Sequence, residues 1–195
     1  MLISNLSYKN ILNDITFNIP KGLSYLKGKN GAGKSTLLDC ISGVNKDYDG
    51  EIKGNNSVVY LNQNLYFSYR LKSYDFVNFI CSIEGIKKYE EQFLIYLDRY
   101  DLKNYYGKIR DKEVGKLSGG ERIKLFFIVI CFIEREWYIF DEPFAGVDEE
   151  GKKIMVKIIK DIIARDKNVI ITSHEVEPLK YFNDINIIEI IDGKL

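Results

Sequence analysis

The chain contains the stretch Gly28-Lys29-Asn30-Gly31-Ala32-Gly33-Lys34-Ser35, which fits the pattern G-x-x-x-x-G-K-[ST]. The residues from Leu23 to Lys27 before it predict a short strand, and those from Lys34 to Ser42 predict a helix that ends at Gly43. Glycines let successive backbone N–H groups turn toward phosphate oxygens, and the positive end of the following helix faces the same phosphates. The stretch therefore predicts a phosphate-binding loop.

Two side chains of this loop carry chemistry that such sites need. The Lys34 ammonium can reach the β- and γ-phosphates, and the Ser35 hydroxyl can ligate Mg²⁺. A chance match to a glycine-rich turn is disfavoured, because a strand and a helix flank the loop in the right order. The motif indicates a nucleoside triphosphate, but alone it leaves kinase, GTPase and transporter open.

Composition and charge exclude several classes of protein. The 195 residues favour one domain, and 28 Lys and Arg balance 28 Asp and Glu. A neutral chain argues against nucleic acid as the main ligand, because a phosphate footprint needs surplus cations. The apolar run from Leu125 to Ile133 falls far short of the about 20 residues of a membrane-spanning helix. Cys40, Cys81 and Cys131 have no disulfide or zinc spacing, so we expect a soluble, cytoplasmic domain.

Alternating strands and helices predict the fold class. The apolar stretches Trp137 to Phe140 and Val169 to Thr172 are typical of strands, and a helix is expected between them over residues 149–165. This order indicates an α/β fold with a parallel sheet. From about residue 73 to residue 134 the apolar spacing is helical instead. We expect a single domain, 1–195, with an inserted helical subdomain at about 73–134.

Two acids follow the predicted strand Trp137 to Phe140. Carboxylates at the carboxyl end of a buried parallel strand lie where α/β sheets bind ligands. Asp141 would hold Mg²⁺, directly or through water, and Glu142 would act as general base toward the attacking water. A charged turn that simply ends the strand is the alternative, and it loses weight beside a phosphate loop. The second acid favours a hydrolase, because many proteins with such a loop carry only the Asp.

A second glycine pair stands in Leu117-Ser118-Gly119-Gly120-Glu121, before a long apolar run. Ser118 and Glu121 have the spacing of a capping box, which predicts a helix that begins here. Two glycines in the first turn cost about 1 kcal/mol each relative to Ala, and capping does not explain them. Backbone N–H groups at a helix N-terminus form an anion site, so a phosphate contact would explain Gly119 and Gly120.

Together these motifs resemble the ATP-binding subunit of ABC transporters, and the resemblance covers essentially the whole chain. Leu117 to Glu121 is similar to the family's signature sequence, with Glu121 in place of the more usual Gln. Four further residues resemble family motifs: Tyr8 the aromatic residue that stacks on adenine, Gln63 the Q-loop glutamine, Asp148 the D-loop aspartate and His174 the switch histidine.

The resemblance implies a role for each residue. The catalytic residues would be Lys34, Gln63, Glu142 and His174, and the Mg²⁺ ligands would be Ser35, Gln63 and Asp141. The nucleotide would contact Tyr8, Asn30, Gly31, Ala32, Gly33, Lys34, Ser35 and Thr36. Taken alone, His174 is more typical of a capping or surface residue and Gln63 of a plain loop residue, and Tyr8 could belong to the core.

The resemblance also implies a fold and an assembly. The fold is that of a P-loop NTPase core with a parallel sheet, a small antiparallel β subdomain and an inserted α-helical subdomain. Two protomers, identical or paralogous, would form a head-to-tail dimer that holds ATP between one phosphate loop and the partner's Ser118, Gly119 and Gly120. Hydrolysis would power transport through separate transmembrane permease subunits at the inner face of the cell membrane, without nucleic acid.

Other functions share some of these motifs. A soluble ABC ATPase of DNA repair, chromosome handling or translation is disfavoured, because the chain has no room for a long coiled coil and carries a single cassette. A GTPase is disfavoured because Tyr48 stands where the guanine-reading N-K-x-D motif has its Asp. The aromatic segment from Leu65 to Leu71 could dock a helix of the permease or build the core of the helical subdomain, and the sequence leaves both open.

Overall fold

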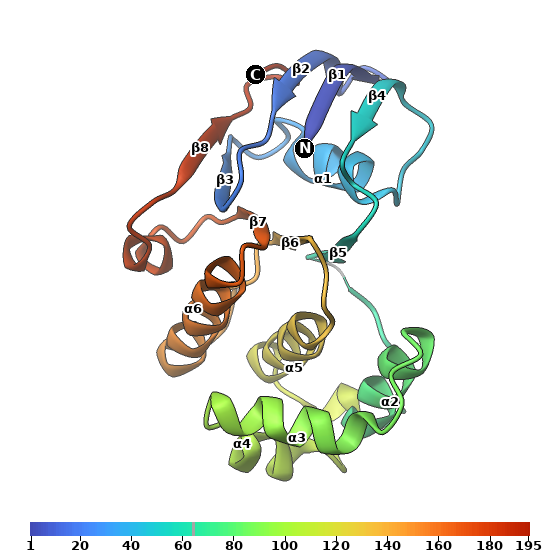
Figure 1. Ribbon diagram of the computed structural model, residues 1–195, viewed down its shortest axis with the longest axis vertical. Coiled ribbons are helices and arrows are strands. Elements are labelled where there is room, and N and C mark those ends of the chain that lie inside the picture. The colour runs from blue at the N-terminus through green and yellow to red at the C-terminus, as the bar shows by residue number, and fades with distance from the viewer. Residues whose placement is uncertain (64) are drawn as a thin grey trace. The chain divides into compact units, whose positions relative to one another are not determined.

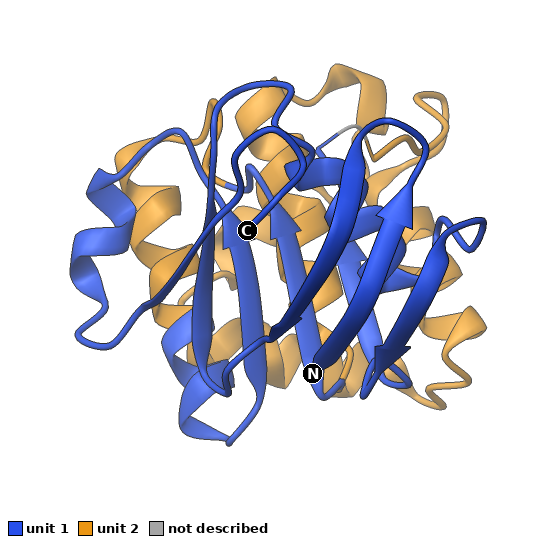
Figure 2. Cartoon of the chain, turned by 90° about the horizontal axis from the view of Figure 1, so that it is seen from above, with its two compact units in different colours: residues 1–63, 135–143, 159–195 blue, residues 64–134, 144–158 orange. Residues whose placement is uncertain are grey.

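The computed structural model describes residues 1–63 and 65–195, and the chain forms two compact units. Unit 1 comprises residues 1–63, 135–143 and 159–195, and unit 2 comprises residues 64–134 and 144–158 (Figure 2). Neither unit is one continuous segment, because the chain leaves unit 1 and returns to it twice.

A five-stranded sheet forms the centre of unit 1, in the order β5-β6-β7-β3-β8 (Figure 1). The strands are β3 (Leu23–Lys27), β5 (Val58–Leu61), β6 (Trp137–Asp141), β7 (Asn168–Thr172) and β8 (Asn186–Glu189). All of their pairings are parallel. Strands β6 and β7 are buried along their whole length, as expected inside a parallel sheet. The carboxyl ends of β3, β7 and β6 therefore meet at one edge.

A small antiparallel sheet of order β2-β1-β4 also belongs to unit 1. Its strands are β1 (Leu2–Tyr8), β2 (Leu12–Asn18) and β4 (Asp49–Lys53). The pairing of β1 with β4 is irregular between Ser4 and Ser7, and Asn5 has a φ of 50° there. A Cβ on Gly50 would lie 2.4 Å from the Asn5 carbonyl oxygen, so the bulge in β1 requires a glycine opposite it.

One hydrophobic core joins both sheets to helix α1 (Lys34–Ser42). The helix contributes Leu37, Leu38, Cys40 and Ile41, the antiparallel sheet Ile3, Leu6, Leu12 and Ile15, and the parallel sheet Leu26, Ile139 and Ile170. Helix α1 ends at Gly43, which has a φ of 79°, a left-handed conformation that glycine adopts without strain. This core fixes the start of α1, and with it the loop that follows β3.

Unit 2 is helical. Its helices are α2 (Ser73–Ile83), α3 (Tyr89–Arg99), α4 (Lys103–Ile109) and α5 (Gly119–Phe132), with a 3₁₀ turn over Val114–Lys116. Aromatic rings pack them together: the ring centroids of Phe76 and Phe126 lie 4.4 Å apart, and those of Phe93 and Phe132 lie 5.1 Å apart. Helix α6 (Glu149–Ala164) begins in unit 2 and ends in unit 1, where a 3₁₀ helix over Glu177–Tyr181 follows β7.

The structure confirms the predicted α/β fold class. Unit 1 has a parallel sheet and a small antiparallel sheet, and both units contain helices. The predicted bounds of β3 and α1 agree with the observed ones. The sequence does not place β1, whose bulge interrupts the alternation of apolar residues, and it does not separate α4 from α3. No helix in the described part of the chain is long and apolar enough to cross a membrane.

Candidate active site

A cleft of about 500 Å³ lies in unit 1 and takes side chains from the carboxyl ends of the parallel strands. Its lining consists of Ile11, Asn30, Gly31, Gly33, Lys34, Ser35, Thr36, Gln63, Asp141, Glu142 and His174. The residues predicted to be catalytic or to hold Mg²⁺ all belong to this lining, although they are far apart in the sequence. The cleft therefore brings together the predicted catalytic residues and the predicted Mg²⁺ ligands.

The loop after β3 has a shape that glycine alone adopts easily. Gly31 and Gly33 have φ angles of 80° and 102°, and a Cβ on Gly33 would lie 3.0 Å from Leu12 Cδ2. A Cβ on Gly28 would lie 2.6 Å from the Ile190 carbonyl oxygen. Gly33 is also the N-cap of α1 and supplies no side-chain hydrogen bond. The first backbone N–H groups of α1 can therefore bind an anion.

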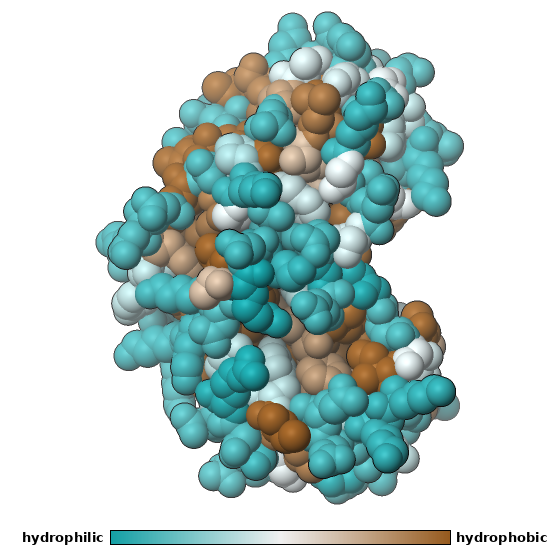
Figure 3. All heavy atoms as spheres, in the orientation of Figure 1, coloured by the Kyte–Doolittle hydropathy of each residue, from teal (hydrophilic) through white to brown (hydrophobic). Residues whose placement is uncertain are grey.

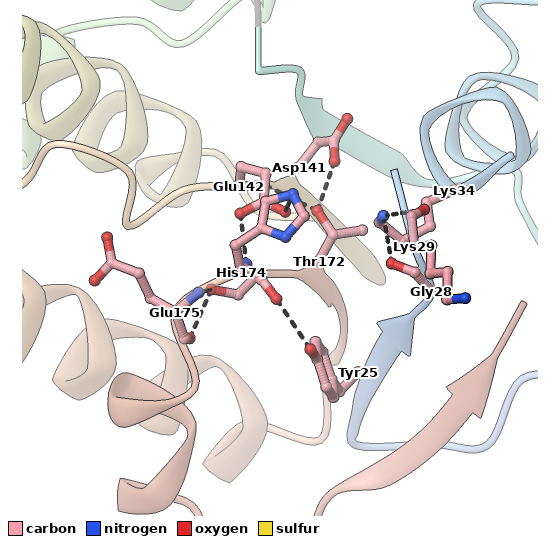
Figure 4. A network of polar contacts seen from close by, with 10 residues as sticks. Tyr25, Gly28, Lys29, Lys34, Asp141, Glu142, Thr172, His174 and Glu175 are labelled. Carbon is pink, nitrogen blue, oxygen red and sulfur yellow. Dashed lines mark hydrogen bonds and ion pairs between the residues drawn. The ribbon is translucent and has the colours of Figure 1, made fainter. Parts of the chain in front are cut away.

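The Lys34 ammonium folds over its own loop. Its Nζ donates hydrogen bonds to the carbonyl oxygens of Gly28 at 2.8 Å and Lys29 at 3.1 Å (Figure 4). Both acceptors are neutral, and a charged phosphate oxygen forms the stronger hydrogen bond with an ammonium. The lysine can therefore exchange a carbonyl for a phosphate without leaving the loop.

Asp141 is the last residue of β6 and Glu142 follows it directly; the two residues are 3% and 9% exposed. Thr172 at the end of β7 contacts both of them. Its hydroxyl donates a hydrogen bond to Asp141 Oδ1 at 2.5 Å and accepts one from the Glu142 backbone N–H at 3.0 Å. The sheet register pairs Asp141 with Thr172, which places them side by side. Such partners offset the cost of burying carboxylates.

Glu142 and His174 face each other at the ends of β6 and β7 (Figure 4). Glu142 Oε2 accepts a hydrogen bond from the His174 backbone N–H at 2.8 Å, and Oε1 lies 3.5 Å from His174 Nε2. The Glu142 side chain is 8% exposed, whereas the imidazole is 59% exposed. A buried carboxylate beside an accessible imidazole is suited to proton transfer and to contact with a terminal phosphate.

Tyr25 of β3 supports the segment that carries His174. Its hydroxyl donates a hydrogen bond to the Ser173 carbonyl oxygen at 2.9 Å (Figure 4). Burial raises the pKa of Tyr25, and the negative charge of Glu142 raises this pKa further. The hydroxyl therefore keeps its proton, and with it the hydrogen bond, throughout the neutral pH range.

The oxygen atoms of the cleft fit a hard cation. The Ser35 hydroxyl, the Gln63 amide and the Asp141 carboxylate share its lining, and Mg²⁺ takes oxygen ligands from protein, water and phosphate. Across residues 1–63 and 65–195, no group of three His, Cys, Asp or Glu side chains can hold a metal on its own.

Two residues predicted to contact the nucleotide lie outside the cleft lining that the structure describes. Ala32 is buried, and Tyr8 packs against the hydrophobic core of unit 1, with Lys9 Nζ 4.9 Å from its ring centroid. Ile11 lines the cleft and is 40% exposed. The sequence does not single out Ile11, because an isolated apolar residue after a strand carries no pattern.

The predicted signature residues begin α5 in unit 2. The capping box is present: the Ser118 hydroxyl accepts a hydrogen bond from the Glu121 N–H at 3.1 Å, and the Glu121 carboxylate accepts one from the Ser118 N–H at 2.8 Å. The bond from the Ser118 backbone lowers the pKa of Glu121, so this side chain is ionised at the positive end of the helix.

The two glycines after Ser118 have different surroundings. A Cβ on Gly120 would lie 2.4 Å from the Gly146 carbonyl oxygen, whereas a Cβ on Gly119 would have no atom of the described chain within 4 Å. Packing inside unit 2 is thus sufficient to require glycine at position 120. At position 119 no packing contact in the described chain requires glycine. A phosphate contact is therefore needed to explain only Gly119.

Asp148, the predicted D-loop residue, is joined to α5 within unit 2. Its Oδ1 accepts a hydrogen bond from the Gly151 N–H at 2.9 Å and lies 4.0 Å from Lys124 Nζ. Lys124 Nζ also lies 4.2 Å from the ring centroid of Tyr105, whose hydroxyl donates to the Glu121 carbonyl oxygen at 2.7 Å. These contacts fix Asp148 relative to the start of α5.

Comparison with known proteins decides the family. A family model described as "ABC transporter" matches residues 12–145, which is more than half of the chain. The chain belongs to the ABC transporter family. It is 30% identical over 180 residues to the uncharacterized ABC transporter ATP-binding protein MJ1023 of Methanocaldococcus jannaschii, with 90% of this chain and 67% of that protein covered. It is also 29% identical over 185 residues to the capsule polysaccharide export ATP-binding protein CtrD of Neisseria meningitidis, with 91% and 80% covered.

Solved ABC ATPases have the same fold. The structure of an ATP binding subunit of an ABC transporter matches with a TM-score of 0.86 at 20% identity, covering 100% of this chain and 87% of that chain. The cassette MJ0796 in a dimeric post-hydrolysis state with ADP and Pi matches with a TM-score of 0.82 at 20% identity, covering 100% and 95%. The protein is therefore an ABC-type ATPase in family and in fold.

Sequence reasoning about this ABC ATPase misses Thr172 and Tyr25, which support the cleft without lining it. A signal exists for Thr172, because it ends a predicted strand next to the one that carries Asp141. Parallel strands in register bring their last residues side by side. No comparable signal exists for Tyr25, because the pairing of β3 with β7 rests on sheet order, which the sequence does not give.

We predict that Lys34→Ala weakens ATP binding and abolishes hydrolysis, because it removes the charged donor of the phosphate loop. The matched control is Lys29→Ala, which removes the same charge from the same loop at a residue outside the lining described above. Binding of a fluorescent ATP analogue and release of phosphate are measured for both proteins. Ordinary turnover by Lys34→Ala protein would contradict the assignment of this loop as the catalytic site.

Proposed function

We propose that the protein hydrolyses ATP with Mg²⁺ in a head-to-tail dimer, formed by two copies or by one copy and a paralogous ATPase subunit. In this dimer the phosphate loop of one protomer and the partner's Ser118 and Gly119 enclose each nucleotide. The dimer powers transport through separate transmembrane permease subunits, at the cytoplasmic face of the membrane. The open space around Gly119 is the observation that carries this proposal.

Gly119 stands in the first turn of α5, where glycine costs about 1 kcal/mol relative to Ala. A Cβ there would touch no described atom within 4 Å, so contacts inside the chain do not require the glycine. A ligand that approaches the backbone N–H groups closely from outside would require it. The cleft of unit 1 already contains a complete phosphate loop, and a second phosphate-binding element on the same chain is what a site shared by two copies needs.

The positions of the cleft residues suggest how they bind MgATP. Lys34 and the N–H groups at the start of α1 hold the β- and γ-phosphates. Ser35, Gln63 and Asp141 hold Mg²⁺, which when bound neutralises phosphate charge and aligns the γ-phosphate. Asn30, Gly31, Gly33 and Thr36 complete the contacts around the phosphates, and Tyr8 or Ile11 offers an apolar surface to the base.

Glu142 and His174 carry the chemical step in this proposal. As the oxygen of the attacking water bonds to the γ-phosphorus, Glu142 accepts one proton from that water. The bond between the γ-phosphorus and its bridging oxygen breaks, and the electron pair leaves with ADP. His174 donates a hydrogen bond to the γ-phosphate. The hydrogen bond from the His174 N–H to Glu142 Oε2 keeps the base and the phosphate-contacting residue in one arrangement.

Exposed aromatic residues in unit 2 support a permease partner. In the segment after Gln63, Phe67 packs on Phe76 with ring centroids 5.0 Å apart, so this ring serves the core of unit 2. The rings of Tyr66 and Tyr69 instead pack against each other, with centroids 5.3 Å apart, and the two residues are 71% and 46% exposed. The packing of Phe67 agrees with the core alternative, and the exposure of Tyr66 and Tyr69 supports the docking alternative.

Further apolar side chains extend this surface along α2. Leu71, Phe79 and Ile83 are 42%, 51% and 65% exposed, and Figure 3 shows hydrophobic residues in the region of α2, as well as elsewhere on the same face. Exposed apolar patches are typical of sites that receive another protein. A permease helix fits such a patch, and the relative CtrD is named as an export protein, which agrees with a transport function.

We predict that Glu142→Gln traps an ATP-bound dimer. The amide keeps the size of the side chain but cannot accept the proton, and losing a positioned base typically costs about 10²- to 10⁴-fold in rate. ATP should bind at least as well, because a negative charge beside the γ-phosphate is removed. Size-exclusion chromatography with light scattering should show a shift to dimer with ATP that is weak or transient in the wild type.

The control for this experiment is Glu177→Gln, which makes the same change at a side chain that is 79% exposed and pairs with Lys180. It should behave as the wild type in both assays. Wild-type turnover by Glu142→Gln protein would show that Glu142 is not the base. A Glu142→Gln protein that binds ATP tightly and stays monomeric at all concentrations would contradict the dimer.

We also predict that Tyr66→Glu with Tyr69→Glu separates the ATPase from its permease. Charges on this patch should prevent a membrane protein from binding, while the isolated subunit hydrolyses ATP as before. The measurement is co-purification of a multi-spanning protein from detergent-solubilised membranes, with Tyr181→Glu as control, since Tyr181 is 51% exposed in unit 1. Undiminished co-purification with the double variant would rule out this surface, and loss of folding would assign both rings to the core.

A further inference from the structure

Thr172 joins the two acids of the cleft through one hydroxyl group. It is the last residue of β7 and is fully buried, with 0% exposure. The hydroxyl donates to Asp141 Oδ1 at 2.5 Å and accepts from the Glu142 backbone N–H at 3.0 Å (Figure 4). The hydroxyl proton thus bonds to Asp141 in β6, and a lone pair of the hydroxyl oxygen bonds to Glu142, the residue after β6.

Packing alone does not explain a threonine at this place. The preceding residues Val169, Ile170 and Ile171 are apolar and buried, and Val would fill the volume of Thr172 without a hydroxyl. Burying a hydroxyl costs free energy that its hydrogen bonds must offset. A role for the hydroxyl would therefore explain why this buried position holds threonine.

One task is to hold Glu142 in a backbone conformation that glutamate rarely adopts. Its φ is 54°, in the left-handed region that is unfavourable for residues with a Cβ. In this conformation the side chain reaches the segment that follows β7, where Oε2 accepts the hydrogen bond from the His174 N–H at 2.8 Å. The Thr172 oxygen is the acceptor for the Glu142 N–H and so stabilises the conformation that aims the carboxylate.

The second task is to orient Asp141. The hydrogen bond to Oδ1 fixes the rotation of the carboxylate about its Cβ–Cγ bond. Residues that hydrogen-bond a metal ligand commonly set its orientation, and their loss costs about 10- to 100-fold in metal affinity or activity. Because the same hydroxyl bonds both acids, their relative placement depends on one atom.

We propose that Thr172 is a positioning residue, whose hydroxyl fixes the general base Glu142 and the Mg²⁺ ligand Asp141 relative to each other. This inference rests on the proposed function, which gives the two acids those roles. Thr172 itself is buried and is not among the residues that line the cleft. It acts by keeping the two carboxylates in place before the substrate arrives, which spares the reorganisation that hydrolysis would otherwise need.

The direct test compares Thr172→Val with Thr172→Ser in the full chain. Val keeps the shape and removes both hydrogen bonds, so kcat should fall about 10- to 100-fold while KM for ATP changes less than about threefold. Ser keeps the hydroxyl and should recover kcat to within about threefold of the wild type. The free energy of unfolding is measured in parallel, because a purely structural residue would change it without this split between kcat and KM.

A second readout needs neither ATP nor Mg²⁺. Hydrogen exchange of the Glu142 amide, followed by NMR in the nucleotide-free protein, should be faster in Thr172→Val than in Thr172→Ser, because only the Ser hydroxyl can accept that N–H. In the Glu142→Gln background, Thr172→Val should cost much less kcat than it does alone, since the base it positions is already absent.

A folded Thr172→Val protein with wild-type kcat would overturn the inference, as would equal exchange of the Glu142 amide in Val and Ser variants. If Thr172→Val does not fold, Thr172→Cys replaces it, because a thiol matches serine in shape and is a weak hydrogen-bonding group. Glu142→Gln in the same assay separates the two levels. Wild-type turnover by Glu142→Gln protein would contradict the proposed function. If Glu142→Gln protein is inactive but Thr172→Val protein has wild-type turnover, only the positioning role of Thr172 is contradicted.

Discussion

Parallel pairing of β6, β7 and β3 places the carboxyl ends of three strands next to one another, and the candidate active site depends on this adjacency. Strand β3 leads into the phosphate loop, β6 ends at Asp141, and β7 leads to His174. The register pairs Asp141 with Thr172, and beyond this pair the Glu142 carboxylate accepts a hydrogen bond from the His174 backbone N–H. A slip of one residue along β7 would point the Thr172 side chain to the other face of the sheet. The buried, apolar faces of these strands therefore determine the chemistry at their ends.

The cleft holds its charged groups in place before any ligand binds. Glu142 adopts a φ of 54°, a conformation that costs of order 1–3 kcal/mol for a residue with a side chain. Hydrogen bonds from the Glu142 N–H to Thr172 and from the His174 N–H to the carboxylate offset part of this cost. Lys34 is likewise held over the loop by two carbonyl oxygens. Groups fixed in this way need little rearrangement when charge develops on a phosphate.

Much of unit 1 can be predicted from the sequence because its signals are local. The left-handed backbone angles of the loop before α1 require glycines, and Asp141 and Glu142 mark the end of the buried strand β6. These features give the α/β class, the phosphate loop and the residues of the cleft. The pairing of strands that are far apart in the sequence cannot be predicted from local patterns. The contacts of Thr172 and Tyr25 depend on this pairing, so only the structure reveals them. Strand β1 escapes for a different reason, since the bulge at Asn5 breaks the alternation that would reveal it.

The structure also separates residues that the sequence treats alike. Gly119 and Gly120 form one motif, yet Gly120 is required by the Gly146 carbonyl and Gly119 by nothing in the described chain. Phe67 and Tyr66 belong to one aromatic segment, yet one ring is packed and the other is 71% exposed. Space around a side chain is a property of the fold, and a sequence pattern contains no measure of it.

In the proposed dimer each ATP site is built from two protomers, and mixing two inactive variants shows whether this is so. Lys34→Ala removes the ammonium group proposed to bind the β- and γ-phosphates, and Ser118→Arg should block closure at the partner's γ-phosphate while leaving single-protomer ATP binding nearly normal. In a mixed dimer, one site combines the intact loop of one protomer with the intact Ser118 of the other. An equal mixture should regain ATPase activity, up to about a quarter of the wild-type rate, because half of randomly formed dimers contain one intact site of two. No recovery, with mixed dimers demonstrated by co-purification of differently tagged chains, would contradict the shared site.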